Sequence, residues 1–337
     1  MVKRVGNLME KIADRENLNE AFLRAARAKR GRQAVVEFRR NLDKNLLQMR
    51  SQLLDGTFRF GQYQFFTIHD PKTRSICAAS FPERVAFHAI MRICHPVFDN
   101  YQTYDSYACR KGKGQYKALE RAQHFAHRYP WFAKLDVRHY FDSISHTILM
   151  RQLCRLFKDR QLLLYFSDLI CSYSTTEGRG IPIGNLTSQY FANHYLAVAD
   201  HHAKQLLGIG AMVRYMDDIL LFDKGKLELA EKVHHYLSYL HECLSLESHE
   251  PVINKTLHGI PFLGYVVYGN GLRLNRRSKK RYHKKMKELT VGVNLGEITE
   301  GNYADHAQCL TAFVLKASTK GFREDVLNTR GMYLQGL

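Results

Sequence analysis

Three aspartates stand where apolar segments end or turn. Asp136 lies in AKLDV, and Asp217 and Asp218 form a pair inside YMDDILLF. Burying a carboxylate among Leu, Ile, Met and Phe is costly unless a cation neutralises it. Adjacent acids also repel each other, which a divalent ion relieves best. Their hard oxygen atoms favour magnesium over zinc. An adjacent pair alone is also compatible with a solvated turn at a hairpin tip.

The segments that carry these acids predict a mixed α+β fold. Trp131 to Val137 is typical of a short buried strand, and Met212 to Phe222 of a buried hairpin whose tight turn holds the acid pair. Between them, the loop 178–184 (GRGIPIG) opens a helix over 185–202. An apolar stripe predicts an amphipathic helix over 227–246. Alternating strands and helices favour an α+β architecture.

The flanking segments predict further elements. Residues 58–76 are rich in aromatic and β-branched side chains and are broken at Asp70-Pro71, which predicts a two-stranded hairpin. Residues 17–30 form a helix crowded with positive charge, whose simplest interpretation is a solvated face. Residues 262–268 (FLGYVVY) predict another strand, and the tail from residue 276 is helical and basic.

The composition indicates a globular chain with a polyanionic partner. Of 337 residues, 45% are hydrophobic and 24% charged, and Lys and Arg outnumber Asp and Glu by 50 to 32, giving a formal charge of +18. A basic surface kept for solubility is the alternative. The seven scattered cysteines lack a CxxC pair and predict reduced core thiols. With no signal-peptide core or membrane span expected, the predicted location is the cytoplasm.

Three segments together resemble a known family. The Asp136 strand, the loop and helix IPIGNLTSQ, and the YMDD hairpin resemble, in this order, the palm motifs of reverse transcriptases. This resemblance implies a right-hand polymerase fold with fingers, a palm of antiparallel sheet plus helices, and a short helical thumb. It divides the chain into an N-terminal basic helical extension (1–55), interleaved fingers and palm (56–270) and a thumb (271–337). With this division, no RNase H, endonuclease or integrase domain is expected within these 337 residues.

The resemblance also implies the chemistry. Asp136, Asp217 and Asp218, with Val137 beside them, would hold two magnesium ions about 3.5 to 4 Å apart. The reaction would add deoxynucleotides to a primer paired with an RNA template. Lys255 in NKT occupies the place of the lysine that protonates the leaving pyrophosphate.

Further residues are implied to bind substrates. In the segment PKTR, Lys72 and Arg74 match the cations of the fingers that grip the triphosphate of the incoming nucleotide, and the alternative is a solvated turn. Phe141, five positions after Asp136, matches the steric gate that excludes a ribose 2′-hydroxyl, and the alternative is packing in the core. The implied nucleotide-binding residues are Lys72, Arg74, Phe141, Ile183, Gly184 and Gln189. FLGY resembles the primer grip, and the basic segment 273–287 a thumb helix that tracks the duplex, with a solvated helix face as the alternative. The implied primer and template contacts are Tyr215, Met216, Phe262, Leu263, Gly264, Tyr265, Arg276, Arg277 and Lys280.

Finer features resemble the reverse transcriptases of diversity-generating retroelements. Most family members carry QG and a terminal SP in the loop-helix motif, where this chain has Ile183-Gly184 and Ser188-Gln189, and SYACRKGKG adds to the likeness. This implies a bacterial or phage-encoded enzyme that copies a structured RNA with errors at adenines for mutagenic retrohoming. Its implied partner is a small oligomeric accessory protein, the accessory variability determinant. The alternatives are a retron-like or phage-defence reverse transcriptase and, from another class, a non-catalytic RNA-binding scaffold.

Overall fold

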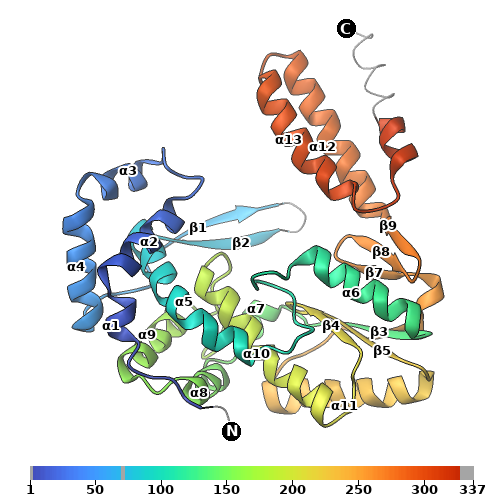
Figure 1. Cartoon of the computed structure of the whole chain (residues 1–337), viewed down its shortest axis with the longest axis horizontal. Coiled ribbons are helices and arrows are strands. Elements are labelled where there is room, and N and C mark those ends of the chain that lie inside the picture. The colour runs from blue at the N-terminus through green and yellow to red at the C-terminus, as the bar shows by residue number, and fades with distance from the viewer. Residues whose placement is uncertain (1–2, 70–72, 327–337) are drawn as a thin grey trace. The chain divides into compact units, whose positions relative to one another are not determined.

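The computed structural model describes residues 3–69 and 73–326, and the chain folds into two compact units (Figure 1). The first unit comprises residues 1–112, 136–208 and 234–250; the second comprises 113–135, 209–233 and 251–337. Both units are built from segments distant in sequence. Helices combine with antiparallel sheets, so the predicted α+β class is confirmed.

The first unit is mainly helical. Helix α2 packs on α5, and the rings of Phe22, Phe38 and Phe81 meet between α2, α3 and the start of α5. A capping box of Ser80 and Glu83 begins α5, which satisfies its first backbone N–H groups. The elements of this unit are α1 (Met9–Ile12), α2 (Arg15–Ala26), α3 (Gln33–Arg40), α4 (Leu42–Leu54), β1 (Tyr63–Ile68), β2 (Arg74–Ala79), α5 (Phe81–Tyr101), α7 (Tyr140–Ser143), α8 (His146–Leu156), α9 (Arg160–Cys171) and α10 (Leu186–Gln205).

The second unit holds two sheets and a helical hairpin. One sheet has the strand order β4-β5-β3-β6, and the other β7-β8-β9. Helix α6 packs on β4, β5 and β8, while α12 and α13 lie side by side (Figure 1). The elements are α6 (Gln115–Arg128), β3 (Trp131–Asp136, its last residue counted with the first unit), β4 (Met212–Tyr215), β5 (Asp218–Asp223), β6 (Val252–Lys255), η1 (Thr256–His258), β7 (Ile260–Phe262), β8 (Tyr265–Tyr268), β9 (Gly271–Leu274), α12 (Arg276–Asn294) and α13 (Glu300–Val314). Helix α11 (Lys226–Leu244) contributes residues to both units.

Two expectations need correction. Residues 262–268 are not one strand: Leu263 and Gly264 adopt positive φ angles of 47° and 87°, and the chain turns back there between β7 and β8. A propensity pattern cannot detect this, because FLGYVVY is apolar on both sides of the turn. The cysteines are free, as predicted, but only Cys77 and Cys94 are buried, while the other five are exposed.

The other predicted elements are present with shifted ends. The hairpin of 58–76 appears as β1 and β2, paired from Tyr63 with Ala79 to Ile68 with Arg74; its predicted break includes residues 70–72, outside the described part. The predicted helices over 185–202 and 227–246 are confirmed as α10 and α11. Among the described residues, no helix is both long and apolar enough to traverse a lipid bilayer.

Candidate active site

The acid pair lies at the tight turn between β4 and β5. Tyr215 pairs with Asp218, so Met216 and Asp217 form the two-residue turn. The flanking strands are buried, which fixes the register of the hairpin. Met216 has φ of 54°, a left-handed conformation that costs a non-glycine residue free energy unless its surroundings hold it. The predicted hairpin with its acids at the turn is therefore confirmed.

A buried arginine braces this turn. Arg214 on β4 is 0% exposed, and its Nη1 donates a 3.1 Å hydrogen bond to the carbonyl of Met216. A guanidinium is buried only where its donors are satisfied. The sequence analysis did not single out Arg214, although a lone arginine within the apolar run of a predicted strand was the signal.

Asp136 is the last residue of β3, the strand next to β5 in the sheet. Ala133 and Leu135 are buried, as expected for a strand that leads an acid out of a core. The Asp136 side chain is 45% exposed; its Oδ2 lies 4.0 Å from His249 Nε2, and its carbonyl accepts a 2.9 Å hydrogen bond from the His249 amide. Val137 is buried and forms a bridge with Ser248.

A lysine that the sequence analysis did not predict meets Asp218. Lys134 Nζ lies 3.4 Å from Asp218 Oδ1 and donates a 2.9 Å hydrogen bond to the carbonyl of Pro261 on β7. Both side chains are mostly covered, at 27% exposure for Lys134 and 22% for Asp218. Lys134 is a partly covered residue between buried Ala133 and Leu135 on β3, which lies next to β5 in the sheet.

Lys255 lies at the other end of this strand. It pairs with Trp131 at the start of β3, and its Nζ lies 5.7 Å from the centre of the Trp131 ring. Lys134, which meets Asp218, is three residues further along, about 10 Å at the usual strand rise. The structure therefore does not bring Lys255 to Asp218.

The structure does not gather Asp136, Asp217 and Asp218, all of them described residues, into one metal-holding cluster. No group of three or more His, Cys, Asp or Glu side chains within the described ranges is arranged to hold a metal. Magnesium commonly takes only one or two carboxylates, with water and substrate phosphates completing its shell. Asp218 Oδ1 is buried and already faces a cation, so the donor chemistry at this turn fits such an ion.

The predicted nucleotide-binding loop docks on β2 within the first unit. The carbonyl of Ile183 accepts a 2.8 Å hydrogen bond from the Cys77 amide, and the carbonyl of Phe141 accepts one of 3.0 Å from Ile181. Gly184 has φ of 112°, and a Cβ there would lie 2.8 Å from the Ile76 side chain. The loop thus needs glycine to approach β2 closely. Ile183 and Phe141 are both half-buried.

The structure does not bring the other predicted nucleotide-binding residues together as it does Phe141, Ile183 and Gly184. Arg74 is exposed at the first position of β2, and Lys72 lies outside the described residues. Gln189 is exposed on α10, and its Oε1 accepts a 3.4 Å hydrogen bond from the Cys109 thiol.

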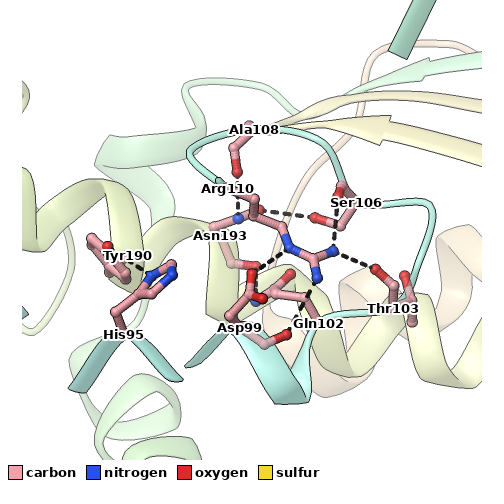
Figure 2. Close-up of polar contacts among 9 residues, drawn as sticks. All are labelled: His95, Asp99, Gln102, Thr103, Ser106, Ala108, Arg110, Tyr190 and Asn193. Atoms are coloured by element: carbon pink, nitrogen blue, oxygen red, sulfur yellow. Dashed lines mark hydrogen bonds and ion pairs between the residues drawn. The ribbon is translucent and has the colours of Figure 1, made fainter. Parts of the chain in front are cut away.

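The segment SYACRKGKG is held by the polar network in Figure 2. Arg110 Nε lies 2.7 Å from Asp99 Oδ1, and its Nη1 donates to the carbonyls of Thr103 and Ser106. Asn193 Nδ2 on α10 donates a 2.9 Å hydrogen bond to the carbonyl of Ala108. The arginine thus ties the loop to the end of α5, and Asn193 ties it to the helix that carries Gln189.

A basic cavity of about 400 Å³ opens between α2, the following loop, β2 and α5. Phe66 and Gly184 also line it, and no described lining residue is acidic. Burial lowers the pKa of His88, and the charges of Arg24, Arg84 and Lys29 lower it further. Burial and cationic neighbours likewise lower the pKa of Lys29 and Arg84. The lining includes five cationic side chains, Arg24, Arg27, Lys29, Arg32 and Arg84, together with His88.

Such crowding of like charges favours an anion. Residues 17–30 thus contribute to a cavity, although their sequence alone favoured a solvated face. The contribution of α5 has no signal within this segment, because Arg84 and His88 lie more than fifty residues further along the chain.

The segment FLGY forms the turn between β7 and β8. Phe262 and Tyr265 are 1% and 0% exposed, so only Leu263 and Gly264 lie at the surface of this motif. Gln115 of α6 donates a 2.7 Å hydrogen bond to the Leu263 carbonyl, and Ser278 of α12 one of 2.8 Å to the Gly264 carbonyl. The turn is thus tied to two helices. The predicted duplex contacts on α12 are all exposed: Arg276, Arg277 and Lys280.

Comparisons with known proteins identify the family. Residues 69–267 match the family described as reverse transcriptase (RNA-dependent DNA polymerase). A putative COX1/OXI3 intron 1 protein of Saccharomyces cerevisiae is 23% identical over 202 residues, which are 57% of this chain and 23% of that protein. The chain thus spans about a quarter of the length of this relative.

Solved telomerase structures resemble the fold. One from Candida tropicalis, in complex with a TWJ fragment of telomeric RNA, has a TM-score of 0.50 at 10% identity, covering 79% of this chain and 55% of that one. One from Candida albicans, also with a TWJ fragment, has a TM-score of 0.48 at 15% identity, covering 82% and 58%. At 10% identity the likeness to the Candida tropicalis structure concerns the fold alone, and the mixed helix and sheet architecture is consistent with a right-hand polymerase. Since the family match spans more than half of its residues, the chain belongs to the reverse transcriptase family.

Proposed function

We propose that this chain is an RNA-directed DNA polymerase whose active site is formed by Asp136, Asp217 and Asp218. The observation that carries this proposal is the β4–β5 hairpin, whose turn presents Asp217 and Asp218. Strand β5 lies next to β3, and Asp136 is the last residue of β3. Family membership supplies the reaction class. The buried strands on either side would keep the carboxylates in a fixed geometry, as transition-state stabilisation requires.

The remaining residues bind and orient the substrates in this proposal. When bound, two magnesium ions would activate the primer hydroxyl and stabilise the charge on the leaving pyrophosphate. Phe141 and the loop of Ile183 and Gly184 bind the incoming deoxynucleotide, and Arg74 with Lys72 contacts its triphosphate. The turn at Leu263 and Gly264 positions the primer end. The exposed cations of α12 neutralise phosphates of the template–primer duplex.

The Asp217→Asn variant tests the proposal. It keeps the shape of the turn but removes a negatively charged ligand, so primer extension should fall at least about a thousandfold while RNA affinity stays within about twofold. Asp223→Asn at the far end of β5 is the matched control, because Asp223 pairs with Lys232 away from the turn and should leave extension nearly unchanged. Synthesis by Asp217→Asn at the normal rate would favour a non-catalytic RNA-binding scaffold or another active site.

The cognate RNA is proposed to contact the basic cavity as well as α12. Five cationic side chains and His88 line the cavity, and the ring of Phe66, half exposed on β1, could stack on an unpaired base. Cations combined with an aromatic platform are typical of single-strand recognition.

We further propose that the enzyme serves a diversity-generating retroelement and copies its RNA with errors at adenines, assisted by an oligomeric accessory protein. Ile183 supports this assignment: its backbone is fixed to β2, and its apolar side chain cannot hydrogen-bond the nucleotide as the usual glutamine could. Purified Ile183→Gln should misincorporate less often opposite template adenine. An unchanged error spectrum assigns Ile183 to packing alone.

A retron-like or phage-defence enzyme is the second candidate. Sequencing the cDNA made on the cognate RNA separates the two, because adenine-directed errors belong to the first. A neighbouring template repeat that differs from a variable repeat at adenines points the same way.

A further inference from the structure

We propose that Lys134 is the internal counter-ion of Asp218, a positioning residue that holds this carboxylate in place and competes with the metal ion for it. The inference rests on the proposed function of the β4–β5 turn. It adds a residue that neither the family motifs nor the sequence pattern assigned.

The first support is the burial of the carboxylate. Asp218 Oδ1 is shielded from solvent, and the side chain as a whole is 22% exposed. A charged carboxylate in such a place is costly unless a cation lies close by. Lys134 Nζ lies 3.4 Å away and supplies that charge from the neighbouring strand.

The second support is that the ammonium is held by a group outside the pair. Lys134 Nζ donates a 2.9 Å hydrogen bond to the Pro261 carbonyl, on β7 of the other sheet. This bond fixes the side chain without using the carboxylate. Pro261 also belongs to the strand that leads into the turn at Leu263 and Gly264, so one lysine joins the acid to the proposed primer-binding hairpin.

Two consequences follow from this geometry. Without a metal ion, the lysine keeps Asp218 paired and the turn ordered, so the protein folds with its acid neutralised. With a metal ion, the ammonium is a nearby like charge that weakens the ion's attraction to Asp218. Removing the positive charge should therefore destabilise the metal-free protein and tighten metal binding, two effects that simple loss of packing would not produce together.

The test measures Mn²⁺ binding by electron paramagnetic resonance and thermal unfolding with EDTA or Mn²⁺, on the full chain without nucleic acid. In Lys134→Met, the Mn²⁺ dissociation constant should fall by about fivefold or more, within the usual range of site couplings. Its unfolding temperature in EDTA should fall, and the gain on adding Mn²⁺ should exceed that of the unaltered protein. Lys134→Gln, which can still donate to Pro261, should tighten Mn²⁺ in the same way and covers the case in which the methionine variant does not fold.

Two controls define the mechanism. Lys117→Met removes the same charge from an exposed position on α6, where Lys117 pairs with Glu120, and should change neither quantity appreciably. In an Asp218→Asn background, Lys134→Met should have little further effect on Mn²⁺ binding, because the carboxylate through which it acts is gone.

Unchanged or weaker Mn²⁺ binding in both Lys134 variants overturns the proposal, as does an equal effect of Lys117→Met. This outcome is separate from failure of the proposed function. The latter would appear as synthesis by Asp217→Asn, whatever the Lys134 variants do.

Discussion

The β4–β5 turn and the basic cavity each gather charges of one sign, but only the turn also holds a charge of the opposite sign. At the turn, acids lie between buried strands, and a lysine from the next strand faces one of them. The cavity is lined by five cationic groups and His88, with no acid in the described lining, and burial with nearby positive charge lowers the pKa of His88, Lys29 and Arg84. The turn contains its own counter-charge. The described lining of the cavity offers no such counter-charge, so an anion would be attracted to it.

The two regions also differ in how they are assembled. The turn is one contiguous segment braced by Arg214, whereas the cavity combines α2, its following loop, β2, α5 and the loop at Gly184. Damage to the turn should therefore act mainly on stability and catalysis, and damage to the cavity mainly on ligand affinity.

Arg214→Met should lower the free energy of unfolding by about 3 kcal/mol, because it removes a charged hydrogen bond and leaves the Met216 carbonyl without this donor. Primer extension should fall as the turn loosens. Urea denaturation measures the first effect. Arg273→Met is the control: this exposed arginine lies 5.1 Å from the Tyr268 ring, and its loss should cost less than about 1 kcal/mol. Equal losses in the two variants would contradict the bracing role.

Gly184→Ala should cost about 2 kcal/mol, from a positive φ and a Cβ placed 2.8 Å from the Ile76 side chain. Displacing the loop from β2 should also raise the KM for deoxynucleotides. Gly112→Ala separates the two causes, because Gly112 has φ of 73° but open space around its Cβ, so it carries the backbone strain alone. The same KM in both variants would show that the close approach to β2 does not affect nucleotide binding.

Neutralising two cations of the cavity, as Arg27→Gln with Arg32→Gln, should weaken RNA binding about tenfold. It should reduce the slope of log affinity against log salt by about 1.4, at about 0.7 per phosphate contact on a single strand. Stability should change little. Fluorescence anisotropy at several salt concentrations provides the measurement. Arg15→Gln, an exposed arginine paired with Asp43, is the control from the same unit and should leave the slope unchanged.

Lys255→Met should have the smallest effect, with primer extension staying within about threefold of normal. The register places Lys255 opposite Trp131, three residues before the lysine that meets Asp218. A general acid is expected to contribute about a hundredfold or more. A loss of that size, with a pH profile shifted relative to the unaltered enzyme, would restore Lys255 as the proton donor and require that β6 move.

Local sequence determined much of this protein. The acid-bearing hairpin, the strand that ends at Asp136, the glycine loop before α10 and the basic α12 were all predictable. Their signals are contiguous: alternation of apolar residues, turn residues and helical spacing arise within one segment. The family resemblance rested on the same segments and led to the same acids.

Tertiary structure alone decided which distant residues meet. Lys134 reaches Asp218 because β3 lies next to β5, and Lys255 falls at the far end because β6 pairs antiparallel to β3. Strand order and register are set by packing of the whole sheet, which no single segment encodes. The basic cavity likewise needed α2 and α5 to pack together. Charge far apart along a chain becomes a binding site only when folding brings it to one place.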